Sequence, residues 1–164
     1  VAHIVADRLE RLNVPIVLDP VMISSSGSVL ADEETIAAFE RLMRMAALTT
    51  PNVPELAALG GESGMTARRV PYLAKGGDTP GDIVADRLFR VGADPLEWQA
   101  SRIVTRHNHG TGCTLSSAIA TELGRGCDLV SAIEKSRAFV RAAMTAAPGF
   151  GAGHGPMGHQ AVRA

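Results

Sequence analysis

The sequence has few of the features that mark several large classes of protein. Its 164 residues include two cysteines and only 4% aromatic residues. Two cysteines are too few for a disulfide framework, which favours a reducing compartment such as the cytoplasm. The formal net charge of −1 indicates neither a nucleic acid nor an anionic membrane surface as a partner. No apolar run reaches the roughly 20 residues of a transmembrane helix, and Val1–Leu12 has the pattern of an amphipathic helix, not of a signal peptide.

What the chain does have is an alternation of short apolar runs with helical patterns. A chain of this length is enough for one domain with its own core. The patterns predict helices at Val1–Leu12, Asp32–Met45, Pro54–Leu59, after Gly112 and at Asp128–Ala147, and strands at Pro15–Leu18, Leu48–Thr50 and Pro71–Ala74. A β-hairpin is predicted from Ile83–Arg90 and Glu97–Val104, around Gly92–Pro95. Strands that alternate with helices predict an α/β fold with a mostly parallel sheet flanked by helices.

Polar residues follow several of the predicted strands. Asp19 follows the first strand, Asn52 and Glu55 follow the second, and Lys75 follows the third. Ligands of parallel sheets bind beyond the carboxyl ends of the strands, so these groups are expected near one another. Oxygen ligands and a lysine suit a magnesium nucleotide. Taken singly, Asp19 could only start a turn, Glu55 could be an exposed first-turn residue, and Lys75 could be a solvated strand end.

The most informative run is the one from His109 to Ser116, which precedes an apolar helical pattern. We expect a helix to begin at or near Cys113, with free N–H groups that favour an anion. The glycines on either side of Thr111 let the backbone approach a ligand closely. A thiol in the first turn is expected to have a lowered pKa and to serve as a base or nucleophile. The alternative is a plain turn with a buried structural cysteine.

Two other features have simpler interpretations. Cys127 is predicted to be a small buried residue. A thiol redox function centred on Cys113 has little support, because no second cysteine stands near it in the sequence. The glycine-rich stretch 148–156 is predicted to be neither helix nor strand. Its composition favours a flexible terminus over a glycine loop that closes on a ligand.

In sequence order, the motifs Leu-Asp-Pro-Val-Met, Thr-Pro-Asn-x-x-Glu, Lys-Gly-Gly and His-Gly-Thr-Gly-Cys-Thr-Leu-Ser together resemble a known family. They are similar to those of the hydroxymethylpyrimidine/phosphomethylpyrimidine kinases of thiamine biosynthesis, which have the ribokinase-like fold. The resemblance extends from Val1 to about His159. Sugar kinases of the same superfamily usually have aspartate where Cys113 stands, and the cysteine is characteristic of the pyrimidine kinases and of some close pyridoxal-kinase relatives.

The resemblance implies ATP-dependent phosphorylation of 4-amino-5-hydroxymethyl-2-methylpyrimidine and of its monophosphate. It further implies a cytoplasmic homodimer that uses ATP and Mg²⁺. In this family pattern Cys113 is the base, and the anion hole is formed by the backbone N–H groups of Gly110, Thr111, Gly112 and Cys113. Lys75 contacts the ATP phosphates, Asn52 and Glu55 organise magnesium and its waters, and Asp19 lies near the phosphates and the metal.

The chain departs from the family pattern in two places. The N-terminal half, which carries much of the pyrimidine pocket, has no counterpart, so residues 1–164 are expected to be the C-terminal part of a single, here incomplete, ribokinase-like domain. The interval between Glu55 and Lys75 is shorter than is usual in the family. This predicts an internal gap, with residues of the family pattern missing between positions 61 and 71. Two other functions stay open: a pyridoxal or pyridoxine kinase of the same fold, and a non-catalytic ligand-binding module.

Overall fold

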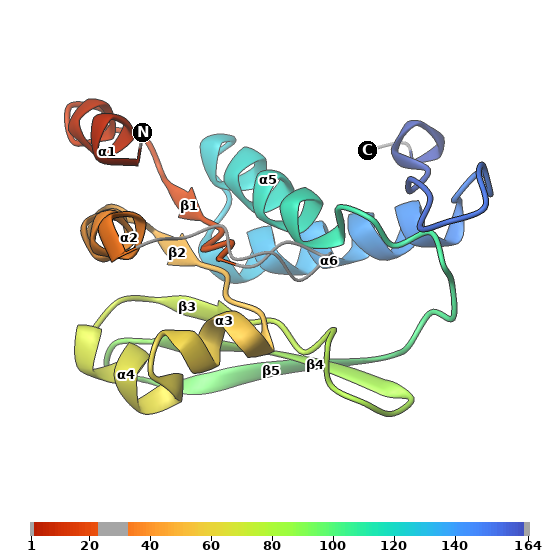
Figure 1. Cartoon of the computed structure of the whole chain (residues 1–164), viewed down its shortest axis with the longest axis horizontal. Coiled ribbons are helices and arrows are strands. Elements are labelled where there is room, and N and C mark those ends of the chain that lie inside the picture. The colour runs from red at the N-terminus through yellow and green to blue at the C-terminus, as the bar shows by residue number, and fades with distance from the viewer. Residues whose placement is uncertain (1, 23–32, 163–164) are drawn as a thin grey trace. The chain divides into compact units, whose positions relative to one another are not determined.

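The computed structural model describes residues 2–22 and 33–162. The chain forms two compact units. The first unit comprises Val1–Ser101 and the second comprises Arg102–Ala164. In Figure 1 the first runs from red to green and the second from green to blue. The predicted helix cap Asp32 and most of the serine-rich loop before it lie outside the described residues.

The first unit contains an alternation of helices and strands, as the sequence predicts. In chain order its elements are α1 (Ala2–Leu9), β1 (Val17–Leu18), α2 (Glu33–Met45), β2 (Leu48–Thr49), α3 (Val53–Ala58), α4 (Gly61–Arg68), β3 (Tyr72–Ala74), β4 (Ile83–Arg90) and β5 (Ala93–Ser101). The observed bounds differ from the predicted ones mostly by one to three residues at the ends, where assignments are least certain.

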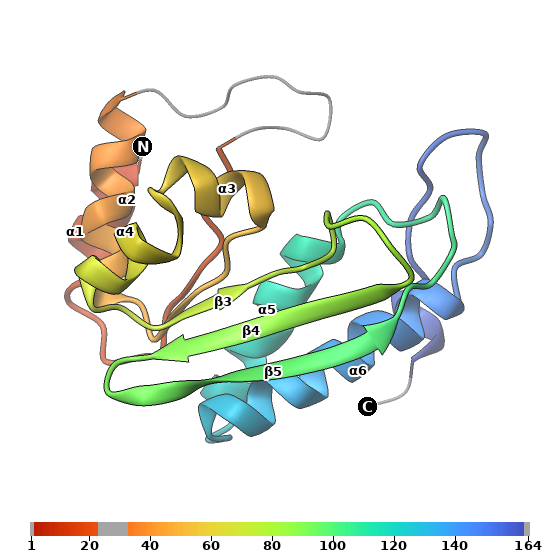
Figure 2. The same ribbon diagram turned by 90° about the horizontal axis from the view of Figure 1, so that it is seen from below.

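The described strands form one five-stranded sheet in the order β1-β2-β3-β4-β5. The pairs β1–β2 and β2–β3 are parallel, whereas β3–β4 and β4–β5 are antiparallel. The α/β fold is therefore confirmed, but the prediction of a mostly parallel sheet is wrong, because half of these strand pairs are antiparallel. The sheet is mixed because β4 and β5 are joined by a tight turn, which permits only antiparallel pairing. Figure 2 shows this long hairpin beside β3.

The hairpin differs from its prediction in where β5 begins. Gly92 has a φ of +74°, and the chain turns at Val91 and Gly92, so β5 begins at Ala93 instead of Glu97. Pro95 lies inside β5, although its position was predicted to belong to the turn. Proline is tolerated in this strand because β5 ends the described sheet and because the β4–β5 register is irregular between Leu88 and Arg90.

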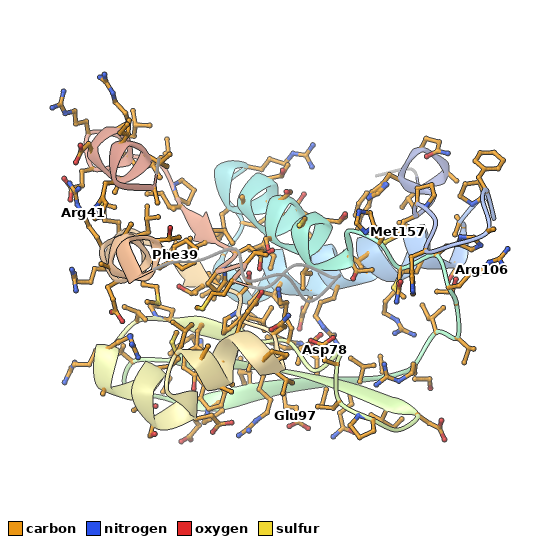
Figure 3. The ribbon with its side chains drawn as sticks, viewed as in Figure 1. Phe39, Arg41, Asp78, Glu97, Arg106 and Met157 are labelled. Carbon is orange, nitrogen blue, oxygen red and sulfur yellow. The ribbon has the colours of Figure 1, made fainter. Side chains whose placement is uncertain are left out.

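A hydrophobic core lies between the helices and the sheet of the first unit. Its buried members are Met22, Met43, Leu59, Met65, Val70 and Tyr72, and Leu18, Phe39, Leu56, Ala74 and Phe89 pack against them. Helix α2 is also tied to α1 by Arg41 (Figure 3), whose guanidinium donates to Asp7 at 2.6 Å and to Glu10 at 2.8 Å. These exposed ion pairs contribute little beside the burial of the apolar side chains.

The second unit is a pair of helices, α5 (Thr111–Gly124) and α6 (Leu129–Thr145), followed by a short 3₁₀ turn, η1 (His159–Ala161). The predicted cap of α6 is confirmed, because Asp128 accepts the backbone N–H groups of Val130 and Ser131, each at 3.0 Å. Among the described helices, none has both the length and the apolarity needed to cross a membrane. The buried apolar residues of this unit are Leu115, Ile119, Ala132, Ile133, Val140, Ala143 and Met157.

The glycine-rich C-terminal stretch is packed against the segment that precedes α5. Arg106, labelled in Figure 3, donates to the carbonyl of Gly151 at 3.4 Å. The side chains of His154 and Asn108 meet at 3.1 Å, and His109 forms a β-bridge with Pro156. The prediction of a flexible terminus from composition is therefore wrong, because these contacts hold the stretch at several points.

Candidate functional site

Asp19, Glu55 and Lys75 form a compact group in the first unit, called here the acid–lysine cluster. Lys75 Nζ donates to Asp19 Oδ1 at 2.8 Å and lies 4.0 Å from Glu55 Oε2. The side chains of Lys75 and Asp19 are only 12% and 15% exposed. Lys75 is therefore not a solvated strand end. Asp19 does start a turn, because its carbonyl accepts the N–H of Val21 at 2.9 Å, and its carboxylate has an ion-pair partner as well.

The sheet brings this cluster together. Asp19 directly follows β1, and Lys75 directly follows β3. Between them, the backbone N–H of Thr50 donates to the carbonyl of Leu18 at 2.9 Å, and that of Lys75 donates to the carbonyl of Pro51 at 2.9 Å. Because the three strands are parallel, their carboxyl ends lie side by side at the same end of the sheet, as the sequence predicts.

Asn52 and Glu55 begin helix α3 with a capping box. Asn52 Oδ1 accepts the backbone N–H of Glu55 at 2.8 Å, and Glu55 Oε2 accepts the backbone N–H of Asn52 at 2.8 Å. This reciprocal pair holds the Glu55 carboxylate in place before any ligand arrives. Glu55 is only 5% exposed, so it is not a solvated first-turn residue.

Burial raises the pKa of the Glu55 carboxyl above its ordinary value. The hydrogen bond from the backbone of Asn52 and the charge of Lys75 oppose this rise, whereas the charges of Asp19 and Asp78 add to it. Asp78 is labelled in Figure 3, in the loop after β3. A buried carboxylate near a second acid favours a neighbouring cation. In this cluster the cation can be a metal ion or the ammonium of Lys75, which could also neutralise a phosphate.

Thr50 also belongs to this site, although the sequence predicted no role for it. Its side chain is fully buried, and its hydroxyl donates to Asp19 Oδ1 at 3.1 Å. The bond fixes the orientation of the carboxylate that Lys75 contacts. Its only signal in the sequence is its place at the end of a strand, which does not reveal a partner 31 residues away.

The second unit holds the predicted anion-binding turn. Gly110 is the N-cap of α5 with a φ of +82°, a conformation that glycine adopts without strain. The helix begins at Thr111, two residues before the predicted start, and its first intrahelical bond runs from Thr114 N–H to Gly110 O at 2.9 Å. The N–H groups of Gly112 and Cys113 precede that bond and therefore have no intrahelical acceptor.

Cys113 is exposed at this helix end, so the alternative of a buried structural cysteine is wrong. It lines a groove of about 1050 Å³ between α5 and α6. Thr114, which also lines the groove, meets His159 Nε2 through its hydroxyl at 2.9 Å. The sequence predicted no role for His159, which only marks the end of the family resemblance, and in the structure its ring fixes the side chain next to the cysteine.

Cys127 differs from its prediction as a small buried residue. It is half-buried, and its sulfur lies 3.3 Å from Glu122 Oε2 and 3.2 Å from Lys135 Nζ. The hydrogen bond from the thiol, together with that from Arg125, holds the pKa of Glu122 below its ordinary value. The polar contacts arise because the turn between α5 and α6 brings charged side chains to the thiol.

The predicted site residues thus fall into two sets. The structure brings Asp19, Asn52, Glu55 and Lys75 together within the first unit, and the glycine turn 110–113 belongs to the second. Within the described residues, no group of three or more His, Cys, Asp or Glu side chains is placed to hold a metal ion. A metal at the cluster would therefore complete its coordination with water or with a ligand's oxygens.

Comparison with known proteins identifies relatives across this chain. A profile of the phosphomethylpyrimidine kinase family matches residues 1–158. The hydroxymethylpyrimidine/phosphomethylpyrimidine kinase of Rhizobium meliloti is 38% identical over 94% of this chain and 64% of its own length. A bifunctional thiamine biosynthesis protein of Geobacter sulfurreducens is 39% identical over 88% of this chain and 32% of its own length.

Among solved structures, an ADP complex of Bacillus subtilis pyridoxal kinase matches with a TM-score of 0.82 and 26% identity. The match covers 98% of this chain and 66% of that protein. A phosphomethylpyrimidine kinase-like protein of Bacteroides thetaiotaomicron has the same fold at a TM-score of 0.69 and 18% identity. These similarities confirm the predicted ribokinase-like fold.

The chain spans less than two thirds of the length of these curated relatives. The alignment with the Rhizobium meliloti enzyme covers 172 positions, more than the chain's 164 residues. That relative therefore carries residues without a counterpart here, and the gap expected between residues 61 and 71 stays a prediction. Because the family profile covers nearly the whole sequence and the relatives agree with it, the chain belongs to the phosphomethylpyrimidine kinase family.

Proposed function

We propose that this protein is an ATP-dependent kinase that phosphorylates hydroxymethylpyrimidine and then its monophosphate, a step of thiamine biosynthesis. Membership of the family supports this function. The observation that carries it is the position of Lys75, whose ammonium lies between Asp19 Oδ1 at 2.8 Å and Glu55 Oε2 at 4.0 Å. A lysine in that position can exchange a carboxylate partner for a phosphate oxygen without a change of backbone.

The glycine turn would supply the electrostatic part of catalysis. The N–H groups at Gly110–Cys113 would bind the transferred phosphoryl group, helped by the positive end of the α5 dipole. Cys113, exposed beside these donors, would accept the proton of the substrate hydroxyl as that oxygen attacks phosphorus. The remaining charge of the phosphates would be neutralised by Lys75.

Magnesium fits the donor set of the acid–lysine cluster. Asp19 and Glu55 offer carboxylate oxygens, which Mg²⁺ prefers, and two such ligands leave room for the waters and phosphate oxygens that it normally retains. Asn52, through the capping box, keeps Glu55 oriented for that role. When bound, the ion would neutralise charge on the nucleotide phosphates.

The proposed partners are ATP and the small pyrimidine, with neither nucleic acid nor a membrane surface involved. We propose a homodimer in the cytoplasm, as the family resemblance implies. Pyridoxal kinase is the second candidate, because the Bacillus subtilis pyridoxal kinase has the same fold at 26% identity. A ligand-binding module without catalysis would bind ATP and release no ADP.

Substituting Glu55 by glutamine is expected to change how stability depends on pH. Because the native pKa of Glu55 is raised above 4.5, the native state binds more protons than the unfolded chain between 4.5 and that raised value. The contribution of Glu55 to wild-type stability therefore falls as pH rises through this window. Glutamine keeps an acceptor for the Asn52 N–H and does not titrate, so the stability of the variant, measured by urea unfolding at a series of pH values, should fall less.

The same variant tests the proposed function. Glu55→Gln removes one charge from the magnesium site and preserves its shape, so turnover should fall and should need more Mg²⁺. A magnesium titration of ATP turnover measures both effects, with Glu62→Gln as a matched control, because Glu62 forms an exposed ion pair with Arg87. Unchanged turnover at every magnesium concentration would remove Glu55 from the site.

A further inference from the structure

We infer that Asp86 is a positioning residue for Lys75, an inference that rests on the proposed role of Lys75 at the nucleotide phosphates. Asp86 lies in β4 and is 8% exposed. One of its carboxylate oxygens accepts the backbone N–H of Gly76 at 3.0 Å, in a buried contact. The bond joins β4 to the residue directly after Lys75.

This bond completes the restraint of the backbone around Lys75. The peptide before Lys75 is held because its N–H donates to the carbonyl of Pro51 at 2.9 Å. The peptide after it is held by Asp86 through the N–H of Gly76. With both flanking peptide planes fixed, the direction of the Lys75 Cα–Cβ bond is fixed as well. From this fixed origin the side chain reaches Asp19 and Glu55 with its ammonium.

The packing around Gly76 shows how closely β4 supports this turn. A Cβ atom added at Gly76 would overlap the carbonyl oxygen of Ala85, the residue before Asp86. On its other side, the carbonyl of Gly76 accepts from the N–H of Thr79 at 3.1 Å and from its hydroxyl at 2.7 Å. The N–H of Gly76 therefore holds the turn after Lys75 against β4, and the carbonyl of Gly76 closes the turn internally through Thr79.

The choice of an aspartate here is informative. Burying a carboxylate is costly unless it is well hydrogen-bonded, and a charged acceptor binds an N–H about twice as strongly as a neutral one. A strand residue selected for packing alone would not need this charge. A rigid turn, in contrast, lowers the ordering cost of binding, because Lys75 does not have to be fixed by the ligand.

The test is a double-mutant cycle on ATP affinity, measured calorimetrically with Mg²⁺ for the wild type, Asp86→Ala, Lys75→Met and the double variant. We expect Asp86→Ala to weaken ATP binding about tenfold and to have less than about a twofold effect when Lys75 is already methionine. Asp86→Asn keeps an acceptor for Gly76 and should bind within about threefold of the wild type. Asp82→Ala, which removes an exposed charge from the same region, should bind like the wild type.

The inference would be overturned if Asp86→Ala weakened ATP binding equally in the wild type and in Lys75→Met. It would also be overturned if Asp86→Ala did not weaken ATP binding at all. Amide hydrogen exchange separates this failure from that of the proposed function. If the wild type binds no ATP, the proposed function fails. The exchange rate of the Gly76 amide hydrogen then still shows whether Asp86 holds the turn. Its amide should exchange at least about tenfold faster in Asp86→Ala than in the wild type, while that of Leu73 in β3 stays unchanged. Unchanged protection of Gly76 would overturn the positioning role.

Discussion

Replacing Cys113 by serine is expected to lower turnover by about 10²–10⁴-fold, the usual cost of removing a general base. A serine hydroxyl is a poor base near neutral pH, whereas Cys113 presents an exposed and more nucleophilic thiol in the first turn of α5. ATP binding should be retained, because the backbone N–H groups of the glycine turn are unchanged. Steady-state kinetics together with a nucleotide-binding assay separate the two effects.

Two companion variants make this test specific. Cys113→Asp should keep partial activity, because a carboxylate can also accept the substrate's proton. Cys127→Ser, at the other cysteine, should behave like the wild type in turnover. Iodoacetamide should label Cys113 faster than the half-buried Cys127, and bound ATP should slow the reaction. Near-normal turnover of Cys113→Ser would mean that Cys113 is not the base and that the anion hole alone carries the catalysis.

Replacing Lys75 by methionine is expected to weaken ATP binding by about 30-fold or more, because the phosphates lose a partly buried cation. The same change leaves Asp19 without its ion-pair partner and so should lower the free energy of unfolding near neutral pH by about 1–3 kcal/mol. Calorimetric titration and urea unfolding measure the two quantities.

The control for this variant is Lys135→Met, because Lys135 is 59% exposed on α6. Its free energy of unfolding should stay within about 0.5 kcal/mol of the wild type. Adding Asp19→Asn to Lys75→Met should recover part of the lost stability, since it removes the orphaned carboxylate, without restoring ATP affinity. If Lys75→Met binds ATP as tightly as the wild type, Lys75 does not contact the phosphates.

The sequence predicted those parts of the fold and site that depend on local pattern. The period of the apolar residues located the helices and strands, Asp128 capped α6 as expected, and the residues that follow the strands met in the acid–lysine cluster. The last result follows from topology, because the carboxyl ends of parallel strands meet at one edge. Residues next to such ends can therefore be grouped before any coordinates are known.

Other features depend on long-range contacts that no local pattern contains. Pro95 looked like a turn residue and lies instead within the edge strand β5. Thr50 and Asp86 act through partners on other parts of the chain, Asp19 and Gly76. The glycine-rich C-terminal stretch was predicted to be flexible from composition, but Arg106 and Asn108 hold it. The composition of a segment indicates its intrinsic conformational freedom. It does not reveal the tertiary contacts that restrict this freedom in the folded chain.

The most direct test of the proposed kinase activity is a coupled ADP-release assay in which hydroxymethylpyrimidine and pyridoxal are compared side by side with ATP and Mg²⁺. We expect ADP release that depends on the pyrimidine, exceeds the rate with pyridoxal and is lost in Cys113→Ser. Faster release with pyridoxal would contradict the pyrimidine assignment in favour of the second candidate. Tight ATP binding without ADP release on either substrate would contradict the kinase activity itself.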